Sequence, residues 1–530
     1  MTGVSEIDIQ QRGAFGIQAD YGIRGSTFQQ TAILLDGVKI NDSQTAHFNC
    51  DIPLPLVLLE QINIVPGQGS SIYGSAAMCG TLDIKSKNAE SNSFFLKSYA
   101  ASYNTFYSGG TLSLSSPHSY LLLSADESSS DGYSYDLDFR RFAAAIKTGC
   151  EEPGFTTDFY AGYSGKDFGA YDFYTPGKNM PSREKTEALL LSSSSKIFFQ
   201  KDTANITLSY KRHLDDFILT LLNPSAYKNI HMSNDARVEL SYNPFFDNGI
   251  KSIFGLSYGV SALDSSNLGK RQEEAPGVFI ETFLPVTESS SLAGAVLFEA
   301  RKQLCETAAS LAFAFKPDPG TDIRLSAGRA FRFPSFTELY YIDPFNIGSE
   351  KLAAEKAYSL ELALASVLSP ESKGSLTLFY RYQNEMIDWV SESGLWKAQN
   401  TGTADFYGAS TNLEYSGNKI LRAGLSYSFI KAVPGTAYVS KYALNFPEHK
   451  LTVNLSLNLP WEITLSLPAL FIVRNNTGNY ETFSLTVLKK TGDLSLTFSI
   501  NNLFDRQYQD VAGVPAPGRI FSMGAEIYFR

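Results

Sequence analysis

Several features typical of soluble enzymes and helical membrane proteins are missing from this sequence of 530 residues. A membrane-spanning helix needs about 20 consecutive apolar residues, and no apolar run approaches that length. We find no nucleophile–base constellation, no paired His or Cys ligands and no phosphate-binding loop opening a helix. The sequence therefore argues against a helical membrane bundle and against an enzyme.

The net charge and the cysteine spacing argue against a nucleic-acid partner and against a cysteine metal site. The formal charge is −10, whereas a nucleic-acid partner requires a basic face. The four cysteines are too widely spaced for a metal motif. Met1 is followed by Thr-Gly-Val-Ser-Glu, which has neither the basic nor the apolar region of a secretory signal.

Aromatic residues are abundant but unevenly chosen, with 37 Phe and 29 Tyr against 3 Trp. Apolar and polar residues alternate in many segments, clearly in Leu376–Tyr382, Leu451–Leu459 and Phe521–Phe529. A strand with lipid on one face and a hydrated lumen on the other has this period of two. Because only a closed barrel leaves no unpaired strand edge in lipid, we expect a transmembrane β-barrel. A large soluble β-protein such as a propeller is the alternative.

The first part of the chain has a different character. From Tyr21 to Lys87, short apolar runs alternate with turn signals such as Asp36-Gly37 and Pro66-Gly67. Asp-Gly between two apolar runs predicts a tight hairpin, since its turn needs positive φ. The apolar residues are too few for an independent core, so we expect a small domain of strands and loops.

The order of motifs in this stretch resembles the plug of TonB-dependent outer-membrane receptors. The matching motifs are Ile23-Arg24-Gly25, Leu34-Leu35-Asp36-Gly37-Val38, Leu59-Glu60-Gln61-Ile62, Pro66-Gly67, and Tyr73-Gly74-Ser75-Ala76-Ala77 with Gly80 and Ile84. Two later segments, 328–361 and 502–508, are similar to the family's Phe-Arg-x-Pro…Glu-Leu-Tyr and Asn-Leu-Phe-Asp signatures. Across all three blocks the resemblance is nearest to the cobalamin-receptor branch.

This resemblance implies an all-β membrane protein. We expect a 22-stranded antiparallel transmembrane β-barrel over residues 89–530, with a small N-terminal α+β plug domain, residues 1–88, inside its lumen. The family's signal peptide and energy-coupling box are not seen before the plug, so we expect the plug to be incomplete at its N-terminus.

The resemblance also implies a ligand site on the upper plug loop, 38–51. A ring that can pack on a ligand and amides that can bond to it are adjacent there, and the candidate contacts are Gln44, His47, Phe48 and Asn49. Arg12, Arg24 and Asp36 are candidates for ionic contacts between plug and barrel, and Arg24 and Asp36 could also pair within the plug. Ordinary loop packing or solvated surface charges are the plainer interpretations.

Two further sites are weaker hypotheses. Asp126, Glu127, Asp131, Asp136 and Asp138 could gather around Ca²⁺, which takes 6–8 oxygen ligands, or they could belong to a solvated turn. Cys50 and Cys79 both fall in the expected plug and could pair in an oxidising periplasm, or remain buried thiols.

The implied function is energised import of a scarce ligand, most simply cobalamin or a related corrinoid. A ferric-siderophore or haem receptor is the close alternative, and a passive or structural outer-membrane barrel without energy coupling is the alternative of another class. The expected partners are a TonB-type energy-coupling protein, outer-membrane lipid and lipopolysaccharide, and the barrel-assembly machinery. We expect no nucleic-acid partner and no cofactor beyond calcium in the loops.

Overall fold

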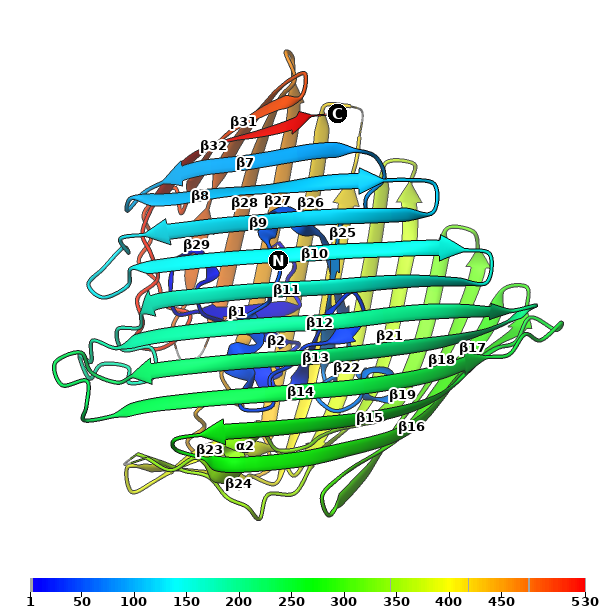
Figure 1. Cartoon of the computed structure of the whole chain (residues 1–530). Coiled ribbons are helices and arrows are strands. Elements are labelled where there is room, and N and C mark those ends of the chain that lie inside the picture. The colour runs from blue at the N-terminus through cyan, green and yellow to red at the C-terminus, as the bar shows by residue number, and fades with distance from the viewer. Residues whose placement is uncertain (1–2, 344, 418, 475–476, 530) are drawn as a thin grey trace.

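A closed antiparallel barrel surrounds a small N-terminal domain in the computed structural model (Figure 1). The structure describes residues 3–343, 345–417, 419–474 and 477–529. None of the helices in these ranges is long and apolar enough to cross a membrane. The sequence-based prediction of a 22-stranded barrel with a plug in its lumen is confirmed.

The barrel strands follow chain order and close where β32 pairs with β7. β29 and β30 both pair with β28 and together form one interrupted strand, which brings the total to 22. The strands are β7 (Ser93–Ala101), β8 (Thr105–Ser115), β9 (Ser119–Ser130), β10 (Phe139–Glu152), β11 (Phe155–Gly169), β12 (Arg183–Phe199), β13 (Asp202–Ile218), β14 (Lys228–Asn243), β15 (Lys251–Ser265), β16 (Gly269–Thr287), β17 (Ser290–Arg301), β18 (Leu304–Asp318), β19 (Thr321–Arg332), β21 (Glu355–Ser369), β22 (Ser372–Asn384), β25 (Thr403–Tyr415), β26 (Leu421–Pro434), β27 (Pro447–Leu459), β28 (Ile463–Arg474), β29 (Tyr480–Phe483), β30 (Leu485–Thr491), β31 (Leu494–Asn501) and β32 (Ile520–Phe529).

The expected alternation along the strands is present. In β22, Leu376, Leu378 and Tyr380 are 43–47% exposed on the outside, whereas Phe379 and Arg381 between them are buried against the lumen. The outer face is therefore apolar, as lipid contact requires, and the inner face carries the polar side chains.

The plug contains two small sheets. One is the pair β1–β2, and the other has the order β4-β3-β6-β5, with β3 and β6 parallel. Its elements are β1 (Ile7–Gln11), η1 (Ala14–Gly16), β2 (Ala19–Ile23), η2 (Phe28–Gln30), β3 (Thr31–Leu35), β4 (Val38–Lys39), η3 (Ala46–Cys50), η4 (Leu56–Leu58), β5 (Leu59–Pro66), α1 (Ser70–Tyr73) and β6 (Gly80–Ser86). The predicted hairpin at Asp36-Gly37 is confirmed, with φ of 50° and 85° at the two turn residues.

The connections differ between the two ends of the barrel. At one end most are short turns, such as residues 153–154 between β10 and β11, and the other end carries the long loops, some with structure of their own. These loops hold α2 (Phe336–Tyr340), β20 (Asn346–Ile347), β23 (Ile387–Glu392) and β24 (Leu395–Asn400). By analogy with barrels of this kind, the long loops form the outer face.

The plug is attached to the wall in two chemically different ways. Its apolar core, centred on Ile33, Leu35 and Leu58, continues into Leu122, Ala145, Tyr160 and Leu190 of β9–β12. On the opposite side, β1 meets β25–β28 through polar groups. The expected domain boundary at residue 88 falls between β6, the last plug strand, and β7, the first barrel strand.

Candidate functional site

The upper plug loop, which joins β4 to β5, is held together by its own polar groups. The Asp42 carboxylate accepts hydrogen bonds from the backbone N–H of Gln44 (2.9 Å) and Thr45 (3.4 Å). The Asp42 N–H donates to Oδ1 of Asn49 at 2.9 Å. These bonds close the loop around η3 and fix the positions of its side chains. We call residues 40–51 the apex loop.

Two carboxylates of the apex loop anchor it to the barrel wall. Asp42 Oδ2 lies 3.1 Å from Lys211 Nζ, and Asp51 lies 2.7 Å from Lys166 Nζ and 2.8 Å from His213 Nε2. Burial by itself would raise the pKa of both carboxyls, but Lys211 at Asp42 and Lys166 at Asp51 more than offset it, and both pKa values lie below the ordinary range. Both groups are therefore ionised and paired.

The four predicted ligand contacts all lie in the apex loop, and all have partners or cover within the protein. His47 Nδ1 is 2.8 Å from Asp20, and its ring stacks on Phe28 at 4.1 Å between centroids. Phe48 stacks on His213 at 4.5 Å. Asn49 closes the loop, and the Gln44 side-chain oxygen is buried without a partner among the described residues. Ligand contact by these four residues stays a prediction.

The outer loops cover the apex loop. The N–H groups of Phe336 and Thr337, at the start of α2, donate to the carbonyls of Ser43 (3.2 Å) and Gln44 (3.0 Å). The helix is short, but a capping box between Ser335 and Glu338 fixes its first turn. The α2 segment therefore covers the Ser43–Gln44 part of the apex loop, while Tyr174 and Tyr442 of other loops pack on His47.

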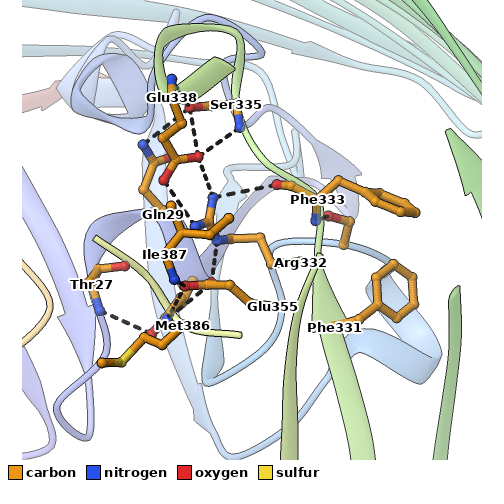
Figure 2. Close-up of polar contacts among 12 residues, drawn as sticks. Thr27, Gln29, Phe331, Arg332, Phe333, Ser335, Glu338, Glu355, Met386 and Ile387 are labelled. Carbon is orange, nitrogen blue, oxygen red and sulfur yellow. Dashed lines mark hydrogen bonds and ion pairs between the residues drawn. The ribbon is translucent and has the colours of Figure 1, made fainter. Parts of the chain in front are cut away.

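A buried arginine joins this cover to the rest of the molecule (Figure 2). Arg332, the last residue of β19, donates to both oxygens of Glu338 at 2.8 and 3.0 Å and to Glu355 at 2.6 Å. Glu355 also accepts from the Ile387 N–H at 2.6 Å and from the plug side chain Gln30 at 3.2 Å. One charge cluster therefore connects the α2 cover, a second outer loop, the wall and the plug.

The predicted ionic residues take different partners. Arg24 contacts Glu361 of β21 and lies 2.6 Å from Glu6 of the plug, so it bridges plug and wall. Asp36 lies 3.2 Å from Lys147 of β10, also across the interface. Arg12 pairs with Asp20 at 2.6 Å within the plug.

The proposed calcium ligands do not come together. Asp126 pairs with Arg141 at 2.7 Å, Asp131 with Asn104 at 2.6 Å, and Asp138 with Arg183 at 2.8 Å. Asp136 accepts a hydrogen bond from the Ser182 backbone, and burial raises the pKa of its carboxyl to about 6. Within the described ranges, no three His, Cys, Asp or Glu side chains are grouped as a metal would require.

Two smaller sequence features also have a defined place. Cys50 and Cys79 are buried free thiols, not a disulfide. Gly255-Leu-Ser-Tyr-Gly259 matches the pattern of a hydrolase nucleophile elbow, but it lies in the middle of the barrel strand β15. The buried Ser257 hydroxyl has no hydrogen-bond partner among the described residues.

Comparison with known proteins agrees with this architecture. The family model "TonB-dependent Receptor Plug Domain" matches residues 1–81, and "TonB dependent receptor-like, beta-barrel" matches residues 82–503. The vitamin B12 transporter BtuB of Vibrio vulnificus strain CMCP6 is 32% identical over 90 residues, which are 17% of this chain and 14% of that protein. The aligned part is thus a small fraction of the relative's length.

Solved structures are similar over nearly the whole chain. The siderophore receptor PirA from Acinetobacter baumannii has a TM-score of 0.84 at 12% identity, covering 100% of this chain and 95% of the other. The copper transporter OprC has a TM-score of 0.83 at 15% identity, covering 99% and 94%. The FrpB iron transporter from Neisseria meningitidis has 0.81 at 13%, covering 100% and 96%. At such identities the likeness establishes the fold alone.

Proposed function

Since the chain belongs to the TonB-dependent receptor family and is an outer-membrane β-barrel, we propose that it imports a scarce ligand with energy from a TonB-type partner. The observation that carries the proposal is the apex loop, which lies in the barrel lumen beneath a cover that hydrogen-bonds to it. The proposal includes no catalytic step, and we keep the division into a plug, 1–88, and a barrel, 89–530, as part of it.

In this mechanism the ligand displaces the α2 segment and binds between the outer loops and the apex loop. His47, Phe48, Asn49 and Gln44 then exchange their internal contacts for contacts with the ligand. The partner pulls on the plug from its N-terminal side, and the plug rearranges within the lumen. Polar and ionic contacts between plug and wall suit this motion, because water can replace each lost hydrogen bond at a small net change in free energy.

We propose cobalamin or a related corrinoid as the ligand, supported by the local similarity to vitamin B12 transporters. A ferric siderophore is the second candidate, supported by the siderophore receptors among the solved structures that share this fold. Haem fits less well, since haem uptake would favour several loop histidines and the apex loop has one, His47.

A binding experiment on the purified protein tests the proposal and separates these ligands. Cyanocobalamin and ferric enterobactin are titrated separately, and binding is followed by quenching of tyrosine and tryptophan fluorescence. We expect saturable quenching by cyanocobalamin. Saturation by the iron chelate alone would replace the corrinoid by a siderophore, and the absence of saturation by both would favour a passive or structural barrel.

A further inference from the structure

The first plug strand, β1, has two chemically different faces. Ile7 and Ile9 point into the apolar core of the plug. Glu6, Asp8 and Gln10 alternate with them and point to the barrel wall, as the period of two along a strand requires. β1 is thus the plug element that separates the plug core from β25–β28.

The contacts of this strand with the wall run along the height of the barrel. Near the outer loops, the Gln10 amide donates to the Asn445 carbonyl at 2.9 Å. Further along, Asp8 is held by Arg474 at 2.5 and 3.0 Å, the Ile7 carbonyl by Lys450 at 2.6 Å, and Glu6 by the Ser410 hydroxyl at 2.8 Å. Toward the end with short turns, the contacts are Ser5–Ser426 (2.7 Å), Ser5–Ser428 (2.8 Å) and Gly3–Thr452 (2.9 Å).

The rest of the plug is held differently. Apolar clusters join it to β9–β12 through Leu122, Tyr160 and Leu190, and to β19 and β21 through Met78, Ala330 and Ala357. Within the described residues, none of the clusters of buried hydrophobic side chains joins β1 to β25–β28. Water can replace polar contacts, whereas separating apolar surfaces exposes them to water. The β1 side is therefore the side on which the plug can leave the wall most easily.

β1 also supplies negative charge to a positively charged part of the barrel wall. On the wall, Arg381, Lys450 and Arg474 gather along this interface, with the carboxylates of Glu361 and Asp510 nearby. From the β1 segment, Asp8 pairs with Arg474 of the wall, whereas Glu6 pairs with Arg24 of the plug. Arg381 keeps two guanidinium nitrogens without hydrogen-bond partners among the described residues. Displacement of β1 would leave a column of hydroxyl donors and an excess of positive charge.

We propose that the import passage opens between the plug and β25–β28 when β1 is pulled away, and that Lys450, Arg474 and the hydroxyls of Ser410, Ser426, Ser428 and Thr452 line it. This rests on the proposed energised import. The lining donates hydrogen bonds and carries positive charge, so it serves cargo with anionic oxygens. Both the phosphodiester of a complete corrinoid and the donor oxygens of an iron chelate meet this requirement.

A pair of matched disulfide tethers tests the position of the passage. S5C/S426C ties β1 to β26, since the two serine hydroxyls are 2.7 Å apart. S71C/S310C ties α1 of the plug to β18, five strands from β26 around the barrel, across a hydroxyl pair 2.9 Å apart. Both are made in a C150S/C305S background to remove the accessible native thiols. Binding and uptake of labelled cyanocobalamin and ferric enterobactin are measured in cells with and without a reductant.

We expect the S5C/S426C tether to abolish uptake, reversibly on reduction, with binding unchanged, while the S71C/S310C protein transports normally. Block by both tethers would mean that the whole plug moves. Block by S71C/S310C alone would place the passage beside β18, and block by neither would show that β1 stays in place. Each of these three results overturns the inference.

A second measurement needs neither ligand nor partner. Single S5C and S71C variants, in the same background, are labelled with a maleimide in purified protein at rising urea concentrations, since both side chains are buried in the folded protein. Because local openings start where apolar contacts are fewest, we expect S5C to react at lower urea than S71C. The reverse order overturns the inference. If the untethered protein takes up neither probe, the proposed ligands are wrong, and this labelling order still decides the position of the passage.

The lining is tested at Lys450. K450Q removes the charge and K450R keeps it, and both leave a donor for the Ile7 carbonyl. We expect K450Q to lower the uptake rate about tenfold, the size of a lost hydrogen bond to a charged group, with ligand affinity unchanged and with K450R close to the parent protein. Equal rates for K450Q and K450R would remove the requirement for a cation.

Discussion

Asp51 provides a quantitative test of how the plug is docked, through the variant D51N. The Asp51 carboxylate joins Lys166 at 2.7 Å and His213 at 2.8 Å, and all three side chains are nearly inaccessible to water. An asparagine has the same shape but leaves the Lys166 charge without a counterion. Removal of one partner from a buried ion pair costs about 3–5 kcal/mol. Lys166 keeps a hydrogen bond to the Ile17 carbonyl at 2.8 Å, so we expect the lower end, ~3 kcal/mol.

The neighbouring Cys50 reports on undocking without any added probe. Burial raises the pKa of the Cys50 thiol to about 12, and a protonated, covered thiol does not react with alkylating reagents. Its modification rate then follows the population of the open apex loop. A loss of ~3 kcal/mol raises this population about a hundredfold, since each 1.4 kcal/mol is a factor of about ten. The assay uses the C150S/C305S background, in which Cys50 and Cys79 are the remaining thiols.

Two variants control the measurement. K85Q breaks the Lys85–Asp83 pair of β6, which is 3.1 Å long but partly exposed, and it should change the rate by less than about fivefold. D51N/K166M removes both charges and should recover most of the lost stability, because the penalty arises from the unpaired charge and not from the missing attraction. A D51N rate equal to that of K85Q would refute the claim that this ion pair docks the plug.

Three further predictions concern the cover, the ligand and pH. R332M leaves Glu338 and Glu355 as buried unpaired carboxylates, at a cost of about 3–5 kcal/mol. Hydrogen exchange of the segment 336–352 should therefore accelerate at least a hundredfold, with R332K intermediate. Unchanged exchange would show that the cover does not depend on Arg332. H47A/F48A/N49A should weaken binding of cyanocobalamin at least tenfold by removing two ring contacts and an amide, with heat-resistant barrel migration on a gel unchanged; unaltered affinity would place the site in the outer loops. In the folded plug, Lys211 and Lys166 lower the pKa values of Asp42 and Asp51 despite the opposing effect of burial. The two carboxylates therefore stabilise the docked plug fully above about pH 4, and this stabilisation is lost as pH falls through the lowered pKa values. Asp388 in the outer hairpin β23–β24 behaves in the opposite way. Burial raises the pKa of its carboxyl to about 6, so the hairpin should lose protection from hydrogen exchange as pH rises through 6. Hydrogen exchange of the apex loop and of this hairpin, measured at several pH values, should show opposite dependences on pH.

The sequence supports the prediction of the barrel and plug because their determinants are local. Alternation along Leu376–Tyr382 requires no knowledge of a partner strand, and Asp36-Gly37 forms its turn through its own backbone preferences. The segment Ser335-Phe-Thr-Glu338 was recognisable in the same way as a capping box, which would have indicated the start of α2.

The partners of the charged residues could not be predicted in this way. Asp51 meets Lys166 and His213, more than a hundred residues away, because the register of β11–β13 and the depth of the plug together set that contact. Arg12 was a candidate for contact with a barrel-wall carboxylate, but it pairs instead with Asp20 of β2, within the plug. A sequence shows which charges exist, but their pairing depends on how two separately folded parts fit together.

The cover and the anchors of the apex loop are adjacent, and this has a consequence for how ligand binding could be sensed. The α2 segment bonds to the carbonyls of Ser43 and Gln44, and the next residue toward the N-terminus, Asp42, is the one held by Lys211. A ligand that displaces α2 therefore frees the backbone beside an anchor of the plug. Only a ligand with different affinities for the covered and uncovered states can shift this balance. Because coupling between two sites is reciprocal, a protein in which the Asp42 anchor is weakened must bind such a ligand with altered affinity. D42N should therefore change the affinity for cyanocobalamin, although Asp42 lies beneath the cover. An unchanged affinity would show that the cover and the plug anchors are not coupled.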